Sequence, residues 1–133
     1  IYTAVRLLEI LSNTNLSSDQ LFKQFPEPCS TPEINVSVPE KDKFNIINTL
    51  QKQAQESIIN SKKHTEQYAD AKLITIDGLR VEFKTGWGLV RASNTTPCLV
   101  MRFEADDQEA LDNIKDIFKN FIHLNFPNLE LPF

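Results

Sequence analysis

The central part of the chain, residues 73–103, holds four short apolar stretches separated by turn signals. This pattern constrains the fold more than any other feature of the sequence. The connections Asp77-Gly78 and Thr85-Gly86 are typical of hairpin turns. Strands joined by such short turns are antiparallel. We therefore expect four consecutive antiparallel strands, at Leu73–Ile76, Leu79–Phe83, Trp87–Val90 and Leu99–Phe103.

Stretches with other periods flank this region. Residues 34–38 alternate apolar and polar side chains, which predicts a further half-buried strand. After Asp42, apolar residues recur every three or four positions, as in an amphipathic helix; they are Phe44, Ile47, Leu50, Ala54 and Ile58. A second helix is expected to begin near Asp106, with a buried stripe of Leu111, Ile114, Ile117, Phe118, Phe121 and Ile122. The order β-α-β-β-β-β-α predicts an α+β fold in which two helices cover one face of an antiparallel sheet.

The first 32 residues have a different character. Residues 1–12 already read as helix, with Ala4, Leu7, Leu8 and Leu11 on one face, and no capping residue precedes them. We expect this segment to be the end of a helix from a preceding domain of a longer protein. Residues 13–32 are expected to form a hinge or linker with one helical turn near Leu21, because prolines make its second half rigid and non-helical. Residues 33–133 would then be one domain.

Composition excludes several classes of partner. The chain has 133 residues, 14 Lys and Arg against 18 Asp and Glu, and a formal net charge of −4. This charge disfavours general binding to nucleic acid or to anionic membranes, and no apolar run is long enough to span a bilayer. Cys29 and Cys98 lie in no metal-binding spacing, and we expect both to be reduced, which favours the cytoplasm.

Catalytic motifs are absent from the sequence, including metal-binding histidine pairs and glycine-rich phosphate loops. His64 and His123 are interpreted as surface or capping residues, and Cys98 as a buried small apolar residue. We expect Trp87 to pack in the core and Arg102 to face solvent or pair with Glu104. The polar segment 57–70 is expected to be a loop with a solvated basic tip at residues 62–64.

The remaining candidate site is the connection between two strands, Arg91-Ala92-Ser93-Asn94-Thr95-Thr96-Pro97. Arg91 can offer a planar fork of donors to two phosphate oxygens, and the hydroxyl and amide side chains add further donors. A tight turn can also aim backbone N–H groups at an anion. Asn94 tolerates a positive φ and could shape the turn. Composition alone favours an ordinary polar hairpin that carries an incidental arginine.

Residues 77–118, which contain the Arg-x-Ser-Asn-Thr-x-Pro pattern, resemble the C-terminal domain of the α-D-phosphohexomutases. Within that superfamily they are most similar to the bacterial phosphomannomutase/phosphoglucomutase branch. Residues 31–34 and the opening helix resemble the same branch. The resemblance covers nearly the whole chain and is weakest through residues 57–70.

The resemblance implies a role within a four-domain isomerase. In such enzymes a phosphoserine in the first domain exchanges a phosphoryl group with the sugar phosphate, through a bisphosphorylated intermediate such as glucose 1,6-bisphosphate. Magnesium is bound in the second domain, and the third reads the sugar hydroxyls. The fourth domain, with a fold like that of the TATA-binding protein, holds the phosphate that is not reacting. This chain alone would then be catalytically inert and would depend on three preceding domains.

Carried over residue by residue, the phosphate-binding loop matches Arg91, Ser93, Asn94 and Thr95, with Thr96 as a supplement. Threonine at position 96 resembles the branch that acts on mannose and glucose 1- and 6-phosphates. The C-terminal domain of a phosphoglucosamine mutase is a second candidate, although those enzymes tend to have glycine where Asn94 stands. A stand-alone anion-binding module and a nucleic-acid-binding domain would also be compatible with such a fold, and net charge disfavours the nucleic-acid-binding domain.

Overall fold

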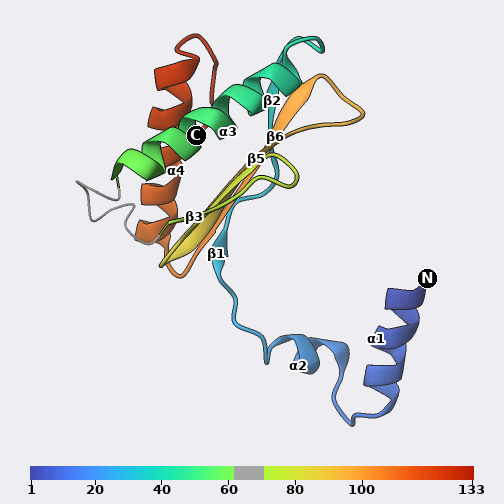
Figure 1. Cartoon of the computed structure of the whole chain (residues 1–133). Helices are drawn as coiled ribbons and strands as arrows, with labels where there is room; N and C mark the ends of the chain where they lie inside the picture. The colour runs from blue at the N-terminus through green and yellow to red at the C-terminus, as the bar shows by residue number, and fades with distance from the viewer. Residues whose placement is uncertain (62–70) are drawn as a thin grey trace.

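The computed structural model describes residues 1–61 and 71–133 (Figure 1). Two helices come first, α1 (Tyr2–Ser12) and α2 (Ser18–Phe22). The elements that follow form one α+β unit. They are β1 (Cys29–Ser30), β2 (Ile34–Ser37), α3 (Lys43–Ser61), β3 (Lys72–Ile74), β4 (Leu79–Phe83), β5 (Gly86–Ala92), β6 (Cys98–Ala105) and α4 (Gln108–Asn125).

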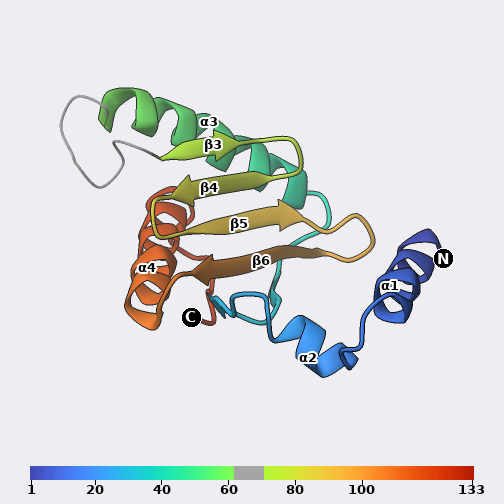
Figure 2. The same ribbon diagram turned by 90° about the horizontal axis from the view of Figure 1, so that it is seen from below.

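The strands form a six-stranded antiparallel sheet in which β6 is central. Strand order is β1-β6-β5-β4-β3. Strand β2 also pairs with β6, on the same side as β1 but with residues nearer the start of β6. The β5–β6 pairing runs from Gly86 opposite Ala105 to Ala92 opposite Leu99. The consecutive strands β3 to β6 are thus neighbours in the sheet (Figure 2), which confirms the prediction of four consecutive antiparallel strands.

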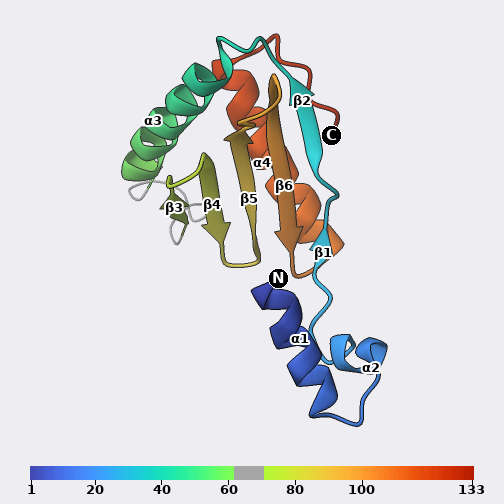
Figure 3. The same ribbon diagram turned by 90° about the vertical axis from the view of Figure 1, so that its right-hand side faces the viewer.

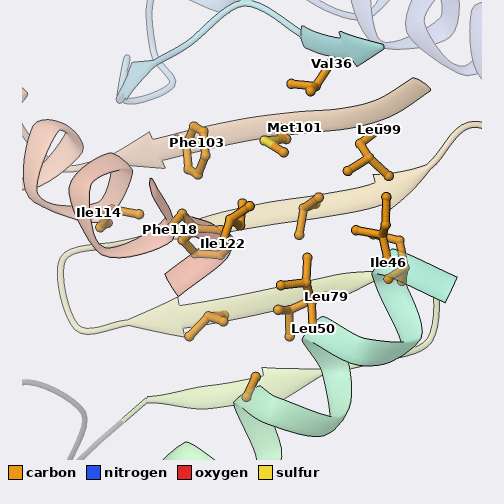
Figure 4. Close-up of a cluster of buried hydrophobic side chains, with 14 of the residues drawn as sticks. Val36, Ile46, Leu50, Leu79, Leu99, Met101, Phe103, Ile114, Phe118 and Ile122 are labelled. Carbon is orange, nitrogen blue, oxygen red and sulfur yellow. The ribbon is translucent and has the colours of Figure 1, made fainter. Parts of the chain in front are cut away.

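Helices α3 and α4 pack on the same face of the sheet and form the core with it (Figure 4). Because strand side chains alternate, every second residue of β6 reaches this core, and Leu99, Met101 and Phe103 are fully buried. From the helices, Leu50, Ile114 and Ile122 meet them with no more than 1% exposure. Phe103 and Phe118 contact edge to face, with ring centroids 5.2 Å apart. The predicted arrangement of two helices on one face is confirmed.

Two aromatic residues expected in the core lie elsewhere. Trp87 is half-buried on the open face of the sheet, away from the helices, where the Arg80 guanidinium lies 3.9 Å from its ring centroid. The glycines beside Trp87 predicted close packing against the helices. Gly88 does face the helices, but successive strand residues point to opposite faces, so Trp87 points away from them. Phe44 is 53% exposed, and the preceding residue, Lys43, is buried in its place.

Among the differences from the predicted element boundaries, four stand out. The predicted hinge contains a short strand, β1, whose Cys29 pairs with Ala105. Ile76 lies outside β3 and is 95% exposed. Strand β5 continues through Ala92, so Arg91 belongs to the strand. Helix α3 continues to Ser61, into the segment predicted as a polar loop, and the rest of that segment, 62–70, lies outside the described residues.

Helices α1 and α2 stand apart from the sheet layer in Figure 3 and contain no buried residue. The predicted helical turn near Leu21 is confirmed as α2, which begins with a capping box between Ser17 and Gln20. Several apolar side chains of this region are exposed, among them Leu8 at 64%. Its stability therefore does not come from the core of the sheet.

Among the described residues, no helix combines the length and hydropathy that a membrane-spanning segment requires.

Gly88 marks the closest approach of the sheet to α4, and this approach can be tested. A methyl group at residue 88 would lie 2.4 Å from Phe118 Cε2 and 2.9 Å from Phe103 Cδ1. We expect Gly88→Ala to lower the free energy of unfolding by about 1–3 kcal/mol, because a close-packed core accommodates extra volume poorly. Urea unfolding of the single variants and of Gly88→Ala/Phe118→Leu gives the coupling energy. Strict additivity would contradict this contact.

Candidate functional site

The loop between β5 and β6 projects past the end of the sheet (Figure 2) and contains the predicted site residues. Its base is closed by a hydrogen bond from Ser93 N to the Cys98 carbonyl at 3.0 Å. At its exit, Cys98 N donates to the Thr96 carbonyl at 2.9 Å. The first bond continues the antiparallel ladder by one step, and the second closes a three-residue turn at the loop exit. Both ends of the loop are therefore fixed to the strands that carry it.

Ser93 organises the inside of the loop. The residue is 8% exposed, and its Oγ lies 2.7 Å from Thr96 Oγ1. The same oxygen accepts hydrogen bonds from Thr96 N at 3.2 Å and from Thr95 N at 3.4 Å. A serine hydroxyl that accepts from the following backbone in this way shapes a turn. The structure thus brings Ser93 and Thr96 together as one hydrogen-bonded pair.

Asn94 and Thr95 form the exposed tip of the loop. Asn94 does not adopt the positive φ that it could tolerate, because within the described ranges positive φ occurs only at Gly78 and Gly86. The Ser93 hydroxyl, rather than a left-handed residue, sets the turn. As a consequence, the side chains of Asn94 and Thr95 remain available to a ligand at the tip.

Arg91 lies on the open face of the sheet, one residue before the end of β5. Its side chain is 34% exposed, and Nη1 is 3.6 Å from Asp77 Oδ2 in the β3–β4 turn. Gly78, with a φ of 88°, lies so close to Arg91 that an added Cβ would be 2.6 Å from Arg91 Cβ. The turn therefore fixes the base of the arginine. The long ion pair with an exposed carboxylate is weak, and a phosphate dianion can compete for the guanidinium.

Cys98 is half-buried beside the loop rather than buried in the core, so the expectation for this residue is wrong. Its Sγ lies 3.2 Å from Thr96 Oγ1 and 3.6 Å from Asn35 Oδ1. The strand alternation explains the difference, since Leu99 points to the helices and Cys98 to the other face. Cys29 pairs with Ala105 at the far end of β6, which separates the two thiols.

Lys43 is the residue of the site that the sequence analysis missed. It is the first residue of α3 and only 1% exposed, and its Nζ donates to the Thr96 carbonyl at 3.3 Å. Its helical spacing could have revealed it. Lys43 precedes the buried residues Ile47, Leu50 and Ala54 by four, seven and eleven positions, which places it on the same face of the helix. A charged residue is not expected in such a stripe.

The arrangement suits anion binding better than covalent chemistry. The loop presents hydroxyl, amide and guanidinium donors at the end of the sheet. Within residues 1–61 and 71–133, no group of three His, Cys, Asp or Glu side chains is placed to hold a metal ion. The pKa of Asp112 is lowered, mainly by a hydrogen bond from Gln108 and also by one from Lys115, but Asp112 lies on α4 and not at the loop.

Residues 33–120 match the model of the family described as phosphoglucomutase/phosphomannomutase, C-terminal domain. The chain belongs to this family. It is 50% identical, over its whole length, to a phosphomannomutase/phosphoglucomutase of Pseudomonas putida. It is also 46% identical, over 99% of its length, to a phosphoglucomutase of Neisseria meningitidis. A solved structure of a phosphoglucomutase/phosphomannomutase family protein from Burkholderia thailandensis matches 99% of the chain, with a TM-score of 0.73 and 36% identity.

The chain spans about a quarter of these relatives, 26% of the two curated proteins and 25% of the solved chain. The family assignment agrees with the resemblance seen in the Arg-x-Ser-Asn-Thr-x-Pro pattern. It also places the loop from Arg91 to Thr96 within the matched residues.

The role of Ser93 in the turn predicts the effect of its removal. In Ser93→Ala, the N–H groups of Thr95 and Thr96 lose their acceptor. We expect faster amide hydrogen exchange at both residues and a loss of about 1–2 kcal/mol in the free energy of unfolding. Asn94→Ala is the matched control, because the Asn94 side chain is exposed at the same loop. Equal exchange rates in the two variants would contradict this role.

Proposed function

We propose that this chain is the C-terminal domain of a phosphomannomutase/phosphoglucomutase and that its loop binds the non-reacting phosphate of a hexose phosphate. The site comprises Arg91, Ser93, Asn94, Thr95 and Thr96. The whole protein would interconvert the 1- and 6-phosphates of mannose or glucose, through a phosphoserine and the 1,6-bisphosphate of the same sugar, which for glucose is glucose 1,6-bisphosphate. The names of the relatives favour these substrates over glucosamine phosphate.

The observation that carries this proposal is that one buried residue fixes the turn from within, while the polar residues beside it are exposed and can contact a ligand. Ser93 is buried and its hydroxyl bonds to that of Thr96 within the turn, while Asn94, Thr95 and Thr96 are exposed. Arg91 stands at the base, and among residues 1–61 and 71–133 its guanidinium has only the long ion pair with Asp77. In a member of this family, such a set of donors on a fixed turn supports phosphate as the ligand.

A loop that binds only phosphate fits the proposed reaction. The bisphosphorylated intermediate must present either of its phosphates to the phosphoserine, so the other end of the sugar must bind in both orientations. Donors that read phosphate and not sugar tolerate this reversal. Binding energy at the distal phosphate would then orient the reacting end, which raises the rate of the chemical step.

The reacting groups of the proposed enzyme would lie outside this chain. The phosphoserine, the magnesium site and the sugar-reading loop belong to preceding domains. The described residues offer no cluster that fits magnesium, so no step of the proposal runs through a metal held here. The chain alone would bind phosphate without turnover.

The domain organisation is part of the same proposal. Residues 33–133 would form the phosphate-binding domain, with residues 1–12 as the end of the preceding domain and 13–32 as the hinge. In support, the family match begins at residue 33, and α1 and α2 contain no buried residue. A hinge of this kind would let the domain close over the ligand and open again. A cytoplasmic location is proposed from the two unpaired thiols.

A titration of the isotope-labelled chain with glucose 1-phosphate, followed by backbone amide NMR, tests phosphate binding. We expect shifts confined to Arg91–Thr96, with a Kd of about millimolar, since one end of a small ligand makes few contacts. Inorganic phosphate is expected to give the same pattern and glucose none. Silence in the loop with both phosphates would contradict the proposal.

Arg91→Ala and Arg102→Ala form a matched pair for the same titration. Both arginines lie on the open face of the sheet, and Arg102 is exposed on the neighbouring strand, opposite Leu89. We expect Arg91→Ala to raise the Kd about tenfold or more, because a charged donor is lost. Arg102→Ala is expected to stay within about twofold, as for an exposed charge. Equal losses in both variants would show only a general effect of charge.

In a protein that carries this chain behind the three proposed domains, mutase kinetics test the whole reaction. We expect Arg91→Ala to lower kcat/KM for glucose 1-phosphate by about 2–4 kcal/mol, or about 30- to 1,000-fold, because the lost contact orients the substrate. A loss below about threefold would reject Arg91 as the anchor of the distal phosphate. A coupled assay that detects glucose 6-phosphate provides the measurement.

A further inference from the structure

Lys43 lies behind the loop, at the start of α3, and its burial is unusual for a lysine. The side chain is 1% exposed, and Nζ has two oxygen partners, the Thr96 carbonyl at 3.3 Å and Glu40 Oε1 at 2.7 Å. The Phe44 ring covers it, with its centroid 5.2 Å from Nζ. The start of α3 and the β5–β6 loop lie at the same end of the sheet (Figure 3).

Two general effects act against a lysine in this place. Burial removes the ammonium from water, which costs stability even when a counter-ion is present. The first residue of a helix also lies at the positive end of the helix dipole, where a cation is disfavoured. The Glu40 carboxylate, which is 66% exposed, offsets part of the charge. What Lys43 specifically provides is its contact with Thr96, 53 residues away in the sequence.

The Thr96 carbonyl is held from two sides. It accepts a hydrogen bond from Cys98 N at 2.9 Å and one from Lys43 Nζ. The next carbonyl, that of Pro97, accepts from Val38 N at 3.0 Å. The segment from β2 to α3 thus binds two successive carbonyls of the loop exit. A carbonyl oxygen repels an anion, and these bonds hold both oxygens toward the protein, which leaves the donors of the loop for a ligand.

We propose that Lys43 is a positioning residue for phosphate binding by the loop Arg91–Thr96, acting through the Thr96 carbonyl from the interior. This inference rests on the proposed function and adds to it a residue outside the Arg-x-Ser-Asn-Thr-x-Pro pattern. Lys43 does not touch the phosphate. It fixes the orientation of Thr96, whose hydroxyl and N–H in turn bond to Ser93.

The test compares Lys43→Met with Lys41→Met in the 133-residue chain. Both variants remove one positive charge, but Lys41 is exposed and lies two residues before Lys43. Inorganic phosphate is titrated at constant ionic strength and followed by amide NMR. Hydrogen exchange at Thr95 and Thr96 reports the order of the loop, and urea unfolding reports the stability of the whole chain. Lys43→Arg is the conservative variant that keeps the charge and the donors.

We expect Lys43→Met to raise the Kd for phosphate about tenfold, as for a lost bond to a charged group, and to speed exchange at Thr95 and Thr96. Lys41→Met is expected to stay within about twofold of the wild type, and Lys43→Arg to recover most of the affinity. A purely structural lysine would change the unfolding free energy but not the Kd. A folded Lys43→Met chain whose Kd equals that of Lys41→Met would overturn the inference.

If Lys43→Met does not fold, Lys43→Gln replaces it under the same criteria. Its amide is polar enough to lie beside Glu40, and its shorter side chain reaches less far toward Thr96.

Different results would overturn the proposed function and the proposed role of Lys43. A wild-type chain that binds no phosphate overturns the proposed function, and this inference with it. A wild-type chain that binds phosphate only as tightly as the folded Lys43 variant overturns the role of Lys43 alone.

Discussion

Strands β5 and β6 pair along the whole of β5, from Gly86 opposite Ala105 to Ala92 opposite Leu99. This pairing sets the register of both the core and the candidate site. In that register Val90, Ala92, Leu99 and Met101 all face the helices and are buried. A shift of one residue would turn these side chains to the open face, so burial of the core strongly favours the observed register. The same register places Ser93 opposite Cys98, where the loop closes.

The alternation that builds the core also divides the chemistry of the loop between two faces. Arg91 follows Val90 and therefore lies on the open face of the sheet, whereas Lys43 reaches Thr96 from the helix side. One cation is 34% exposed and available to a ligand, and the other is buried and occupied by protein oxygens. The loop is thus held from the interior while the groups proposed to bind phosphate face outward. Preorganised donors of this kind lose less entropy on binding a ligand.

Sequence reasoning succeeded where one periodic pattern determines the outcome. The alternating strands, the stripe of α4 and the turn at Gly78 all follow from local spacing. It failed at Trp87 and Cys98, which lie on the face of the sheet opposite the helices. The sequence shows which residues alternate along a strand, but not which face the helices cover. Lys43 was missed for another reason. Its partner is a backbone carbonyl 53 residues away, and backbone partners leave no trace in side-chain patterns.

The Ser93–Thr96 bond changes how the pattern Arg-x-Ser-Asn-Thr-x-Pro is to be understood. If every polar side chain of the loop contacted phosphate, each would need a free donor. Instead the hydroxyl of Ser93 accepts from the backbone of Thr95 and Thr96, and the hydroxyl of Thr96 bonds to it. A serine at this position shapes the turn before any ligand arrives. The motif therefore combines residues that build the turn with exposed residues proposed to face the ligand. Its specificity as a sequence signal would come from both requirements acting on adjacent positions.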